Sequence, residues 1–256
     1  MNWKHSVWRG VSALHEWTKG PSEASGGLRV LCYHSVGTPL PGDSYGLSIG
    51  ASSFRRQMEL VASGSFGRAV SLGGARLDGS SEIVITFDDG FKDTFTTAAP
   101  ILAALNLPFS VAVTASFVEG GKAPHMGVAD LRELAKIPRA EIGAHGANHL
   151  QMAKCGDAQL ADELARSKTF LEDALGSSIG VMTWPHGSAS RRTADFARRA
   201  GFTRAGCSLY GVNEPGRDPL LLKRTEITGF DDERDFTGKA SGTWDWFALR
   251  QGDPAS

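Results

Sequence analysis

The stretch Glu82–Gly90, EIVITFDDG, organises the rest of the sequence. Its first six residues are largely apolar and β-branched, which is typical of a strand buried on both faces. Asp88, Asp89 and Gly90 follow directly. Adjacent carboxylates at a strand end point to different sides, so one can bind a metal ion while the other stays free as a base. Gly90 allows a sharp turn. The same three residues also occur in ordinary turns, and both interpretations stay open at this point.

Outward from this strand, the chain alternates between short apolar runs and amphipathic segments. Further strands are expected at Leu28–Tyr33, Pro108–Val113, Ala140–Ala144, Ile179–Trp184 and Phe202–Ala205, and helices at Ser52–Ser63, Thr94–Leu105, Val128–Lys136, Asp157–Leu175 and Ser190–Ala200. This alternation predicts an α/β fold with parallel strands and covering helices. In such folds the reactive side chains lie just past the carboxyl ends of the strands.

Composition narrows the class of function. The chain has 256 residues and a formal net charge of −1, which predicts one domain and excludes an electrostatic basis for nucleic-acid binding. Its cysteines, Cys32, Cys155 and Cys207, lie far apart, which favours a reducing compartment over a disulfide framework.

The N-terminal segment, residues 1–27, is expected to form an amphipathic helix and a linker. Trp3, Val7, Val11 and Leu14 lie at helical spacing. Such a stripe mostly packs on a core, but a partner protein or a membrane interface also accommodates it. The segment lacks the apolar core of a secretory signal. We therefore expect a cytoplasmic protein, either free or associated with the inner face of the membrane through this helix.

A pair of histidines follows the strand expected at Ala140–Ala144. The spacing His145-x-x-x-His149 brings both imidazoles to one side over a helical turn. Paired histidines are common on surface helices. Two histidines and one aspartate, each from a strand end, instead indicate a catalytic metal site with three protein ligands and an open position. Zinc suits these nitrogen and oxygen ligands, and cobalt, nickel and iron are also compatible.

Two further segments mark turns. Trp184-Pro185-His186-Gly187 follows a strand, and its tryptophan is a candidate wall of a pocket, although a packed turn is an equal alternative. A second acidic run, residues 231–233, lacks a preceding strand and a following glycine. We expect a solvated turn there.

Taken together, three motifs resemble those of a known family. Thr86–Gly90, His145–His149 and Trp184–Gly187, in this order, are similar to the motifs of the polysaccharide deacetylase family, carbohydrate esterase family 4. The similarity spans about Leu28 to Phe236. It implies a distorted (β/α) barrel with about seven parallel strands and removal of N- or O-acetyl groups from sugars.

The resemblance also implies roles for individual residues. Asp89, His145 and His149 would hold a divalent metal, most simply Zn²⁺, and Asp88 would be the general base. Residues 28–250 would form the catalytic domain. Trp184, Pro185 and His186 would bind substrate or support the site.

This chain departs from the family pattern in two ways. No arginine precedes the proline of the third motif, and no histidine follows His186 to protonate the leaving amine. A subgroup that includes the poly-N-acetylglucosamine deacetylases is more similar, and there the acid comes from the first strand, which corresponds to His34. Arg224 is expected to replace the missing arginine beside Asp88. His186 is the rival acid, and His125 is a more distant one that we expect to be exposed to solvent.

The expected function is removal of an N-acetyl group from an acetylated amino sugar, in a glycan, a lipid-linked precursor or a smaller glycoside. One alternative is an amide hydrolase that acts on a non-sugar substrate. Another is a weakly active or inactive relative that only binds carbohydrate or a partner. The intact set of aspartates and histidines favours the enzyme.

Overall fold

The computed structural model describes residues 26–255. The predicted N-terminal helix lies outside the described residues. Within them, no helix combines the length and the apolar character that a membrane span requires.

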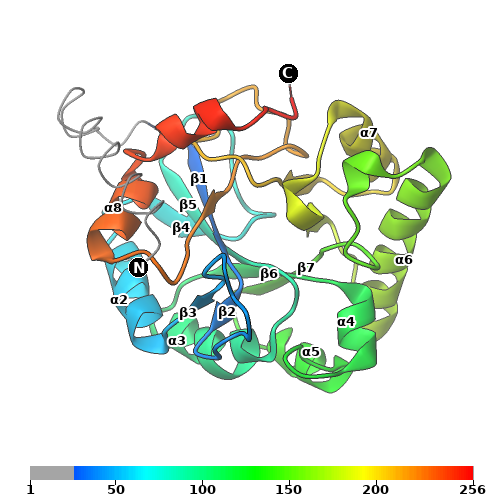
Figure 1. Cartoon of the computed structure of the whole chain (residues 1–256), viewed down its shortest axis with the longest axis horizontal. Helices are drawn as coiled ribbons and strands as arrows, with labels where there is room; N and C mark the ends of the chain where they lie inside the picture. Colours follow the sequence, from blue (N-terminus) through cyan, green and yellow to red (C-terminus); the bar gives the residue numbers. More distant parts are fainter. Residues whose placement is uncertain (1–25, 256) are drawn as a thin grey trace.

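A curled parallel sheet forms the centre of the molecule (Figure 1). Its strands are β1 (Leu28–Tyr33), β4 (Arg68–Val70), β5 (Glu82–Phe87), β6 (Phe109–Val113), β7 (Ala140–Ala144), β8 (Val181–Thr183), β9 (Arg204–Gly206) and β10 (Thr225–Glu226). Seven of them follow the order β10-β1-β5-β6-β7-β8-β9, and β4 lies beside the first half of β5. The predicted barrel-like α/β fold with about seven parallel strands is confirmed.

One extended segment contacts both edges of this sheet. Leu222 pairs with Gly206 at the end of β9, and Thr225 pairs with Leu31 of β1. The chain between these contacts therefore links β9 to β1. Arg224 lies in this joining segment with its side chain buried.

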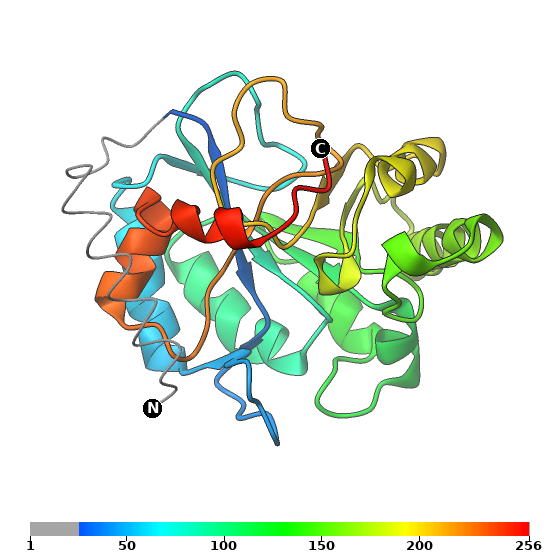
Figure 2. The ribbon, with the colours of Figure 1, turned by 45° about the horizontal axis from the view of Figure 1, so that its top comes forward.

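Helices cover the outside of the sheet (Figure 1). They are α2 (Ala51–Ala62), α3 (Ala99–Ala104), α4 (Ala115–Gly120), α5 (Val128–Leu134), α6 (Asp157–Leu175), α7 (Arg191–Arg199) and α8 (Glu233–Ser241), with a π-helical turn at Thr94–Ala98 and 3₁₀ turns at Met152–Lys154, Pro185–Gly187 and Asp245–Arg250. A two-stranded sheet, β2 (Ser35–Val36) and β3 (Ser48–Ile49), follows β1. The chain after α8 runs back toward the start of β1 (Figure 2). There Asp245 pairs with Arg29 at 2.9 Å.

Aromatic packing fixes the two strands that carry the first motifs. Every residue of β1 and β5 is buried. Phe87 at the end of β5 stacks on Tyr33 of β1 at 5.6 Å and meets Phe109 of β6 edge-on at 6.2 Å. Burial of each large apolar side chain contributes about 1.5–3 kcal/mol. The strand ends that follow these rings are therefore rigidly placed.

The acidic run at residues 231–233 is not a solvated turn, so that expectation is wrong. Asp232 is the N-cap of α8, and its side chain accepts a hydrogen bond from Asp235 N at 3.0 Å. Asp231 is buried, and its carboxylate accepts a hydrogen bond from the buried Lys239 ammonium at 2.7 Å. The run therefore begins helix α8, and Lys239 near the end of that helix neutralises the charge of Asp231.

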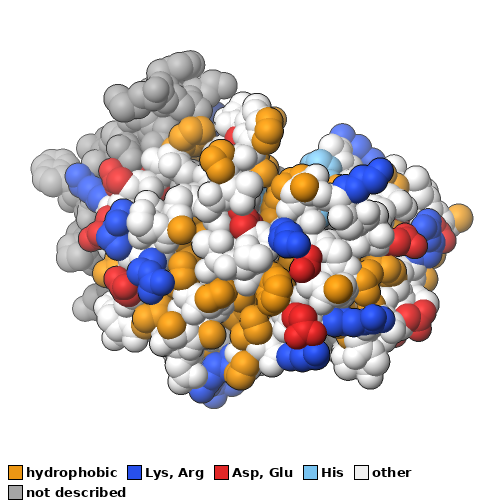
Figure 3. Space-filling view, turned by 90° about the horizontal axis from the view of Figure 1, so that it is seen from below, with side chains coloured by type: hydrophobic (Ala, Val, Ile, Leu, Met, Phe, Trp, Pro, Cys, Tyr) orange, Lys and Arg blue, Asp and Glu red, His pale blue; other side chains and the backbone are white. Residues whose placement is uncertain are grey.

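Charged side chains of both signs are interspersed on the face seen in Figure 3. No extended basic surface lies on that face, in keeping with the net charge of −1. That face therefore offers no electrostatic footprint for a nucleic acid.

Candidate active site

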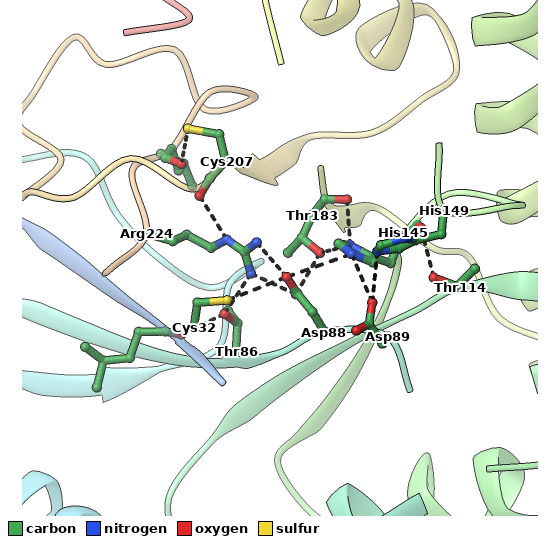
Figure 4. A network of polar contacts seen from close by, with 12 residues as sticks. Cys32, Thr86, Asp88, Asp89, Thr114, His145, His149, Thr183, Cys207 and Arg224 are labelled. Atoms are coloured by element: carbon green, nitrogen blue, oxygen red, sulfur yellow. Dashed lines mark hydrogen bonds and ion pairs between the residues drawn. The ribbon is translucent and has the colours of Figure 1, made fainter. Parts of the chain in front are cut away.

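The carboxyl ends of three parallel strands, and the residue just before a fourth strand, bring the predicted residues together with Thr183 (Figure 4). Asp88 and Asp89 follow β5, His145 follows β7, Thr183 ends β8, and Arg224 directly precedes β10. Parallel strands end at one edge of their sheet, which is why residues so distant in sequence converge here.

Asp88 is buried and fully engaged with polar partners. Its carboxylate accepts hydrogen bonds from Arg224 Nη1 at 2.8 Å and Nη2 at 2.7 Å, and from the Thr183 hydroxyl at 2.9 Å. Arg224 thus lies beside Asp88, where the sequence analysis expected it. Burial alone would raise the pKa of Asp88, but the Arg224 guanidinium and the His145 ring hold it well below its usual range. Asp88 is therefore a carboxylate at any pH at which the protein would work.

Asp89, His145 and His149 converge on one point. Asp89 Oδ1 lies 3.4 Å from His145 Nε2 and 3.1 Å from His149 Nε2. One potential ligand atom from each residue lies within 4.8 Å of the other two. Asp89 Oδ1 is buried and forms no hydrogen bond of acceptable geometry with any described residue. A buried, unsatisfied carboxylate oxygen facing two imidazole nitrogens fits a divalent cation with mixed nitrogen and oxygen ligands.

Burial and the neighbouring carboxylates together set the protonation of the two histidines. Burial lowers the pKa of His145 to about 4, so this ring is neutral at neutral pH. Burial would also lower the pKa of His149, but the neighbouring carboxylates Asp89 and Asp88 raise it. A proton on His149 therefore competes with a cation for the same nitrogen.

The backbone of the site is unusual. Asp89, His149 and His186 have φ values of 70°, 57° and 56°, in the left-handed region. Residues other than glycine rarely adopt it, and each costs on the order of 1–3 kcal/mol unless the surroundings hold it in place. The helical turn expected at His145–His149 is wrong, since this segment is a loop.

Glu163 of α6 holds this loop through its side chain, a role that no motif in the sequence predicts. Its buried carboxylate accepts hydrogen bonds from Ala147 N at 3.0 Å, Asn148 N at 2.9 Å and Asn148 Nδ2 at 2.6 Å. In the sequence, Glu163 shares one helix face with Leu160 and Leu164. A single acidic residue on an apolar helix face indicates a buried carboxylate that needs a polar partner. These hydrogen bonds to Glu163 hold the backbone between His145 and His149 in its loop conformation.

His34 lies on the Asp88 side of the site. It follows β1 and is half-buried. One of its ring nitrogens lies within 4.8 Å of an Asp88 oxygen and of the Cys32 sulfur. Its Nδ1 is buried and has no hydrogen-bond partner among the described residues. A second cation among these three residues is a poor fit, because Arg224 already engages both oxygens of Asp88.

The third motif lies on the other side, next to His149. Trp184 is completely buried and donates from Nε1 to the Leu220 carbonyl at 2.9 Å, so its ring supports the fold and does not wall an open pocket. Pro185 is buried against the loop that contains Gly146. His186 is exposed, with its ring 4.4 Å from that of His149.

His125 is not the solvent-exposed loop residue that we expected. Its ring is half-buried between Phe91, at 4.9 Å, and Phe117, at 4.4 Å. Phe117 in turn contacts His149 at 5.7 Å. Burial lowers the pKa of His125. It is therefore part of a row of aromatic rings that reaches His149.

Solved structures with the same fold include bacterial deacetylases. The Streptococcus pyogenes deacetylase PplD superposes with a TM-score of 0.74 at 19% identity, covering 84% of this chain and 99% of that one. For the putative polysaccharide deacetylase BA0330 from Bacillus anthracis the TM-score is 0.74 at 18% identity, with 84% and 69% covered. For IcaB from Ammonifex degensii it is 0.69 at 24% identity, with 86% and 97% covered.

Sequence comparison identifies the family. The putative polysaccharide deacetylase YxkH of Bacillus subtilis is 23% identical over 146 residues, which make up 57% of this chain and 51% of that protein. The chain thus matches about half the length of this curated relative. A family model described as polysaccharide deacetylase matches residues 76–205, which include all three motifs. The chain belongs to the polysaccharide deacetylase family.

Proposed function

We propose that this protein is a metal-dependent deacetylase that removes the N-acetyl group from an acetylated amino sugar in a glycan or a glycan precursor. One observation carries the proposal. Three potential cation ligands, Asp89, His145 and His149, converge beside a separately held carboxylate, Asp88. Hydrolysis of an acetamide needs both an electrophilic centre and a base.

Asp89, His145 and His149 are the proposed ligands of a divalent cation, most simply zinc. Bound there, the ion would polarise the acetyl carbonyl and make water acidic enough to act as a nucleophile near neutral pH. Three protein ligands leave room for substrate in the coordination sphere, which is typical of catalytic sites.

Asp88 is the proposed general base. Arg224 and Thr183 hold its carboxylate in one orientation and keep it ionised. Because its pKa is low, Asp88 is a weak base on its own. It would take a proton readily only from a water molecule whose pKa a neighbouring cation has lowered. The proposed base therefore depends on the adjoining cation site. A backbone N–H near Phe91 is the proposed second donor to the oxyanion.

His34 is the proposed acid that protonates the departing amine. Its Nδ1, which has no hydrogen-bond partner among residues 26–255, and its position beside Asp88 support this role. His186, beside His149, remains the rival. Both rings adjoin the site from different sides, so single substitutions can separate the two roles.

The test is release of acetate from oligomers of N-acetylglucosamine by the full chain. Wild-type protein should release acetate with Zn²⁺ or Co²⁺, and a chelator should stop the release. Asp88→Asn should keep the metal and lose turnover. Acetate release from simple acetanilides but from no acetylated sugar would favour an amide hydrolase on another substrate. Metal binding without any acetate release would favour a carbohydrate-binding relative.

A further inference from the structure

The hydroxyl of Thr183 lies between a proposed metal ligand and the proposed base (Figure 4). Thr183 is completely buried at the end of β8. Its Oγ1 is 2.9 Å from Asp88 Oδ1 and 2.5 Å from His145 Nδ1. It stands in the stretch before the proline where the family pattern has an arginine and this chain has none.

The directions of these two hydrogen bonds are determined by their partners. Asp88 forms a two-pronged ion pair with Arg224, which is always charged, so its carboxylate is ionised and only accepts. A hydroxyl has one hydrogen, and Thr183 donates it to Asp88. Toward His145 the same oxygen must then accept, so Nδ1 of that ring carries the hydrogen.

A second acceptor strengthens this assignment. The backbone carbonyl of Thr183 lies 3.1 Å from His145 Nδ1, and a carbonyl never donates. With the hydrogen on Nδ1, the lone pair of His145 is on Nε2, the atom that faces Asp89 Oδ1. Such a hydrogen bond to the far nitrogen of a ligating histidine fixes its tautomer and ring orientation.

We propose that Thr183 is a positioning residue that ties the metal site to the base through one chain, His145 Nδ1–H to Thr183 Oγ1–H to Asp88. This inference rests on the proposed function, since it concerns the same site. Without the hydroxyl, His145 Nδ1 has only the backbone carbonyl of Thr183 as an acceptor, and the Asp88 carboxylate loses one hydrogen-bond donor. The imidazole and the carboxylate then lose their fixed relative orientation.

The experiment compares Thr183→Val, which removes the hydroxyl at nearly constant volume, with Thr183→Ser, which keeps it. Thr114→Val is the matched control. Thr114 is also buried, and its hydroxyl contacts the same histidine, but at the backbone carbonyl, 3.2 Å away. Affinity for Zn²⁺ and Co²⁺ is measured by competition with a chromophoric chelator. The visible absorption of bound Co²⁺ reports the ligand geometry.

Thr183→Val should bind both metals about ten- to a hundredfold more weakly, as expected for loss of such a partner. Its Co²⁺ spectrum should change, and turnover at saturating metal should fall. Thr183→Ser and Thr114→Val should remain close to wild type in affinity and spectrum. If the valine variant does not fold, Thr183→Ala removes the same hydroxyl without adding a methyl group. Ring ¹⁵N shifts of the metal-free wild type should place a hydrogen on Nδ1 of His145.

Three results would overturn the inference: wild-type affinity in both hydroxyl-free variants, an equal loss in Thr114→Val, or a hydrogen on Nε2 of His145 in the metal-free protein. Failure of the proposed function looks different. It would appear as absence of metal binding by the wild type, or as metal binding without acetate release. Because affinity and spectrum require no substrate, the role of Thr183 is decided independently of the reaction.

Discussion

Two buried ion pairs in the described part of the chain look alike as single contacts. Asp88 meets Arg224 at 2.7 Å, and Asp231 meets Lys239 at 2.7 Å, with all four side chains almost fully buried. Their surroundings differ. Histidines and a thiol surround Asp88, whereas the rings of Tyr210 and Trp244 and a backbone carbonyl surround the Lys239 ammonium.

These surroundings distinguish a candidate active site in this fold from a structural ion pair. Burial, opposite charge and a shifted pKa occur in both pairs, so none of them is diagnostic. Beside Asp88 there is also a group of potential cation ligands, Asp89, His145 and His149, whose ligand atoms lie within 4.8 Å of one another, whereas no such group among residues 26–255 includes Asp231. Converging nitrogen and oxygen atoms of this kind are typical of a catalytic metal site and have no part in a purely structural ion pair. The following predictions test this distinction.

The largest expected effect is on turnover when the two aspartates are neutralised in turn. Asp88→Asn should lower turnover by about 10²–10⁴-fold, since a general base is lost. Asp231→Asn should leave turnover near wild type below its melting temperature. Both variants should lose stability, on the order of 3–5 kcal/mol, because each leaves a buried cation uncompensated. Acetate release and chemical denaturation measure the two effects.

Equal losses of turnover in Asp88→Asn and Asp231→Asn would contradict the distinction between a catalytic and a structural ion pair. Metal content offers a further check on Asp88→Asn, since the ligand set Asp89, His145 and His149 is intact in it. Loss of the metal in Asp88→Asn would show that this carboxylate supports the metal site, directly or through Thr183, and does not act only in the reaction.

The second prediction concerns the neighbours of each pair. His34→Ala should lower kcat by about 10²-fold or more with KM and metal affinity retained, as expected for loss of a general acid. Tyr210→Phe, which removes a hydroxyl that donates to the Glu226 carbonyl beside Lys239, should leave kcat unchanged. A larger loss in His186→Ala than in His34→Ala would assign the acid role to His186.

The sequence predicts the parts of this site that lie in short contiguous motifs. Strands β1, β5 and β7 have the predicted bounds, and the residues that follow each of them converge as the parallel-sheet rule requires. Arg224 could be inferred because its charge was needed next to Asp88.

Other features depend on tertiary contacts that no local pattern encodes. The helical turn expected at His145–His149 is replaced by a loop because Glu163, on a separate helix, binds its backbone. His125 is enclosed because Phe117 arrives from the start of α4. Asp231 is buried because Lys239 folds back over it. Each of these partners is near in sequence, but periodicity indicates only which face a segment buries and not which side chain contacts the neighbouring loop.

The third prediction tests the contact that holds the loop. Glu163→Gln replaces one carboxylate oxygen by an NH₂ group, so an N–H then faces the backbone donors of Ala147 and Asn148 or the amide of Asn148. Metal affinity should fall by about tenfold, since a support of the ligands is lost. Stability should fall by about 1–3 kcal/mol. Glu172→Gln on the same helix, where the acid binds Lys168 near the surface, is the control and should leave metal affinity unchanged.

The smallest effect is on the pH dependence of stability. The two ion pairs should lose their contributions to the free energy of unfolding at opposite ends of the pH range. The pKa of Asp88 is lowered despite its burial, so its contribution is present above the unfolded pKa of about 3.9 and is lost as pH falls below that value. Burial would lower the pKa of Lys239, but Asp231 raises it. Its contribution is therefore present below the unfolded pKa of about 10.4 and is lost as pH rises through the higher folded value. The free energy of unfolding of the metal-free protein can be measured by denaturation across pH. Asp88→Asn should reduce its fall at acid pH, and Lys239→Met should reduce its fall at alkaline pH. If one substitution reduced both falls, the two pairs would be coupled, and their different surroundings would not explain their different roles.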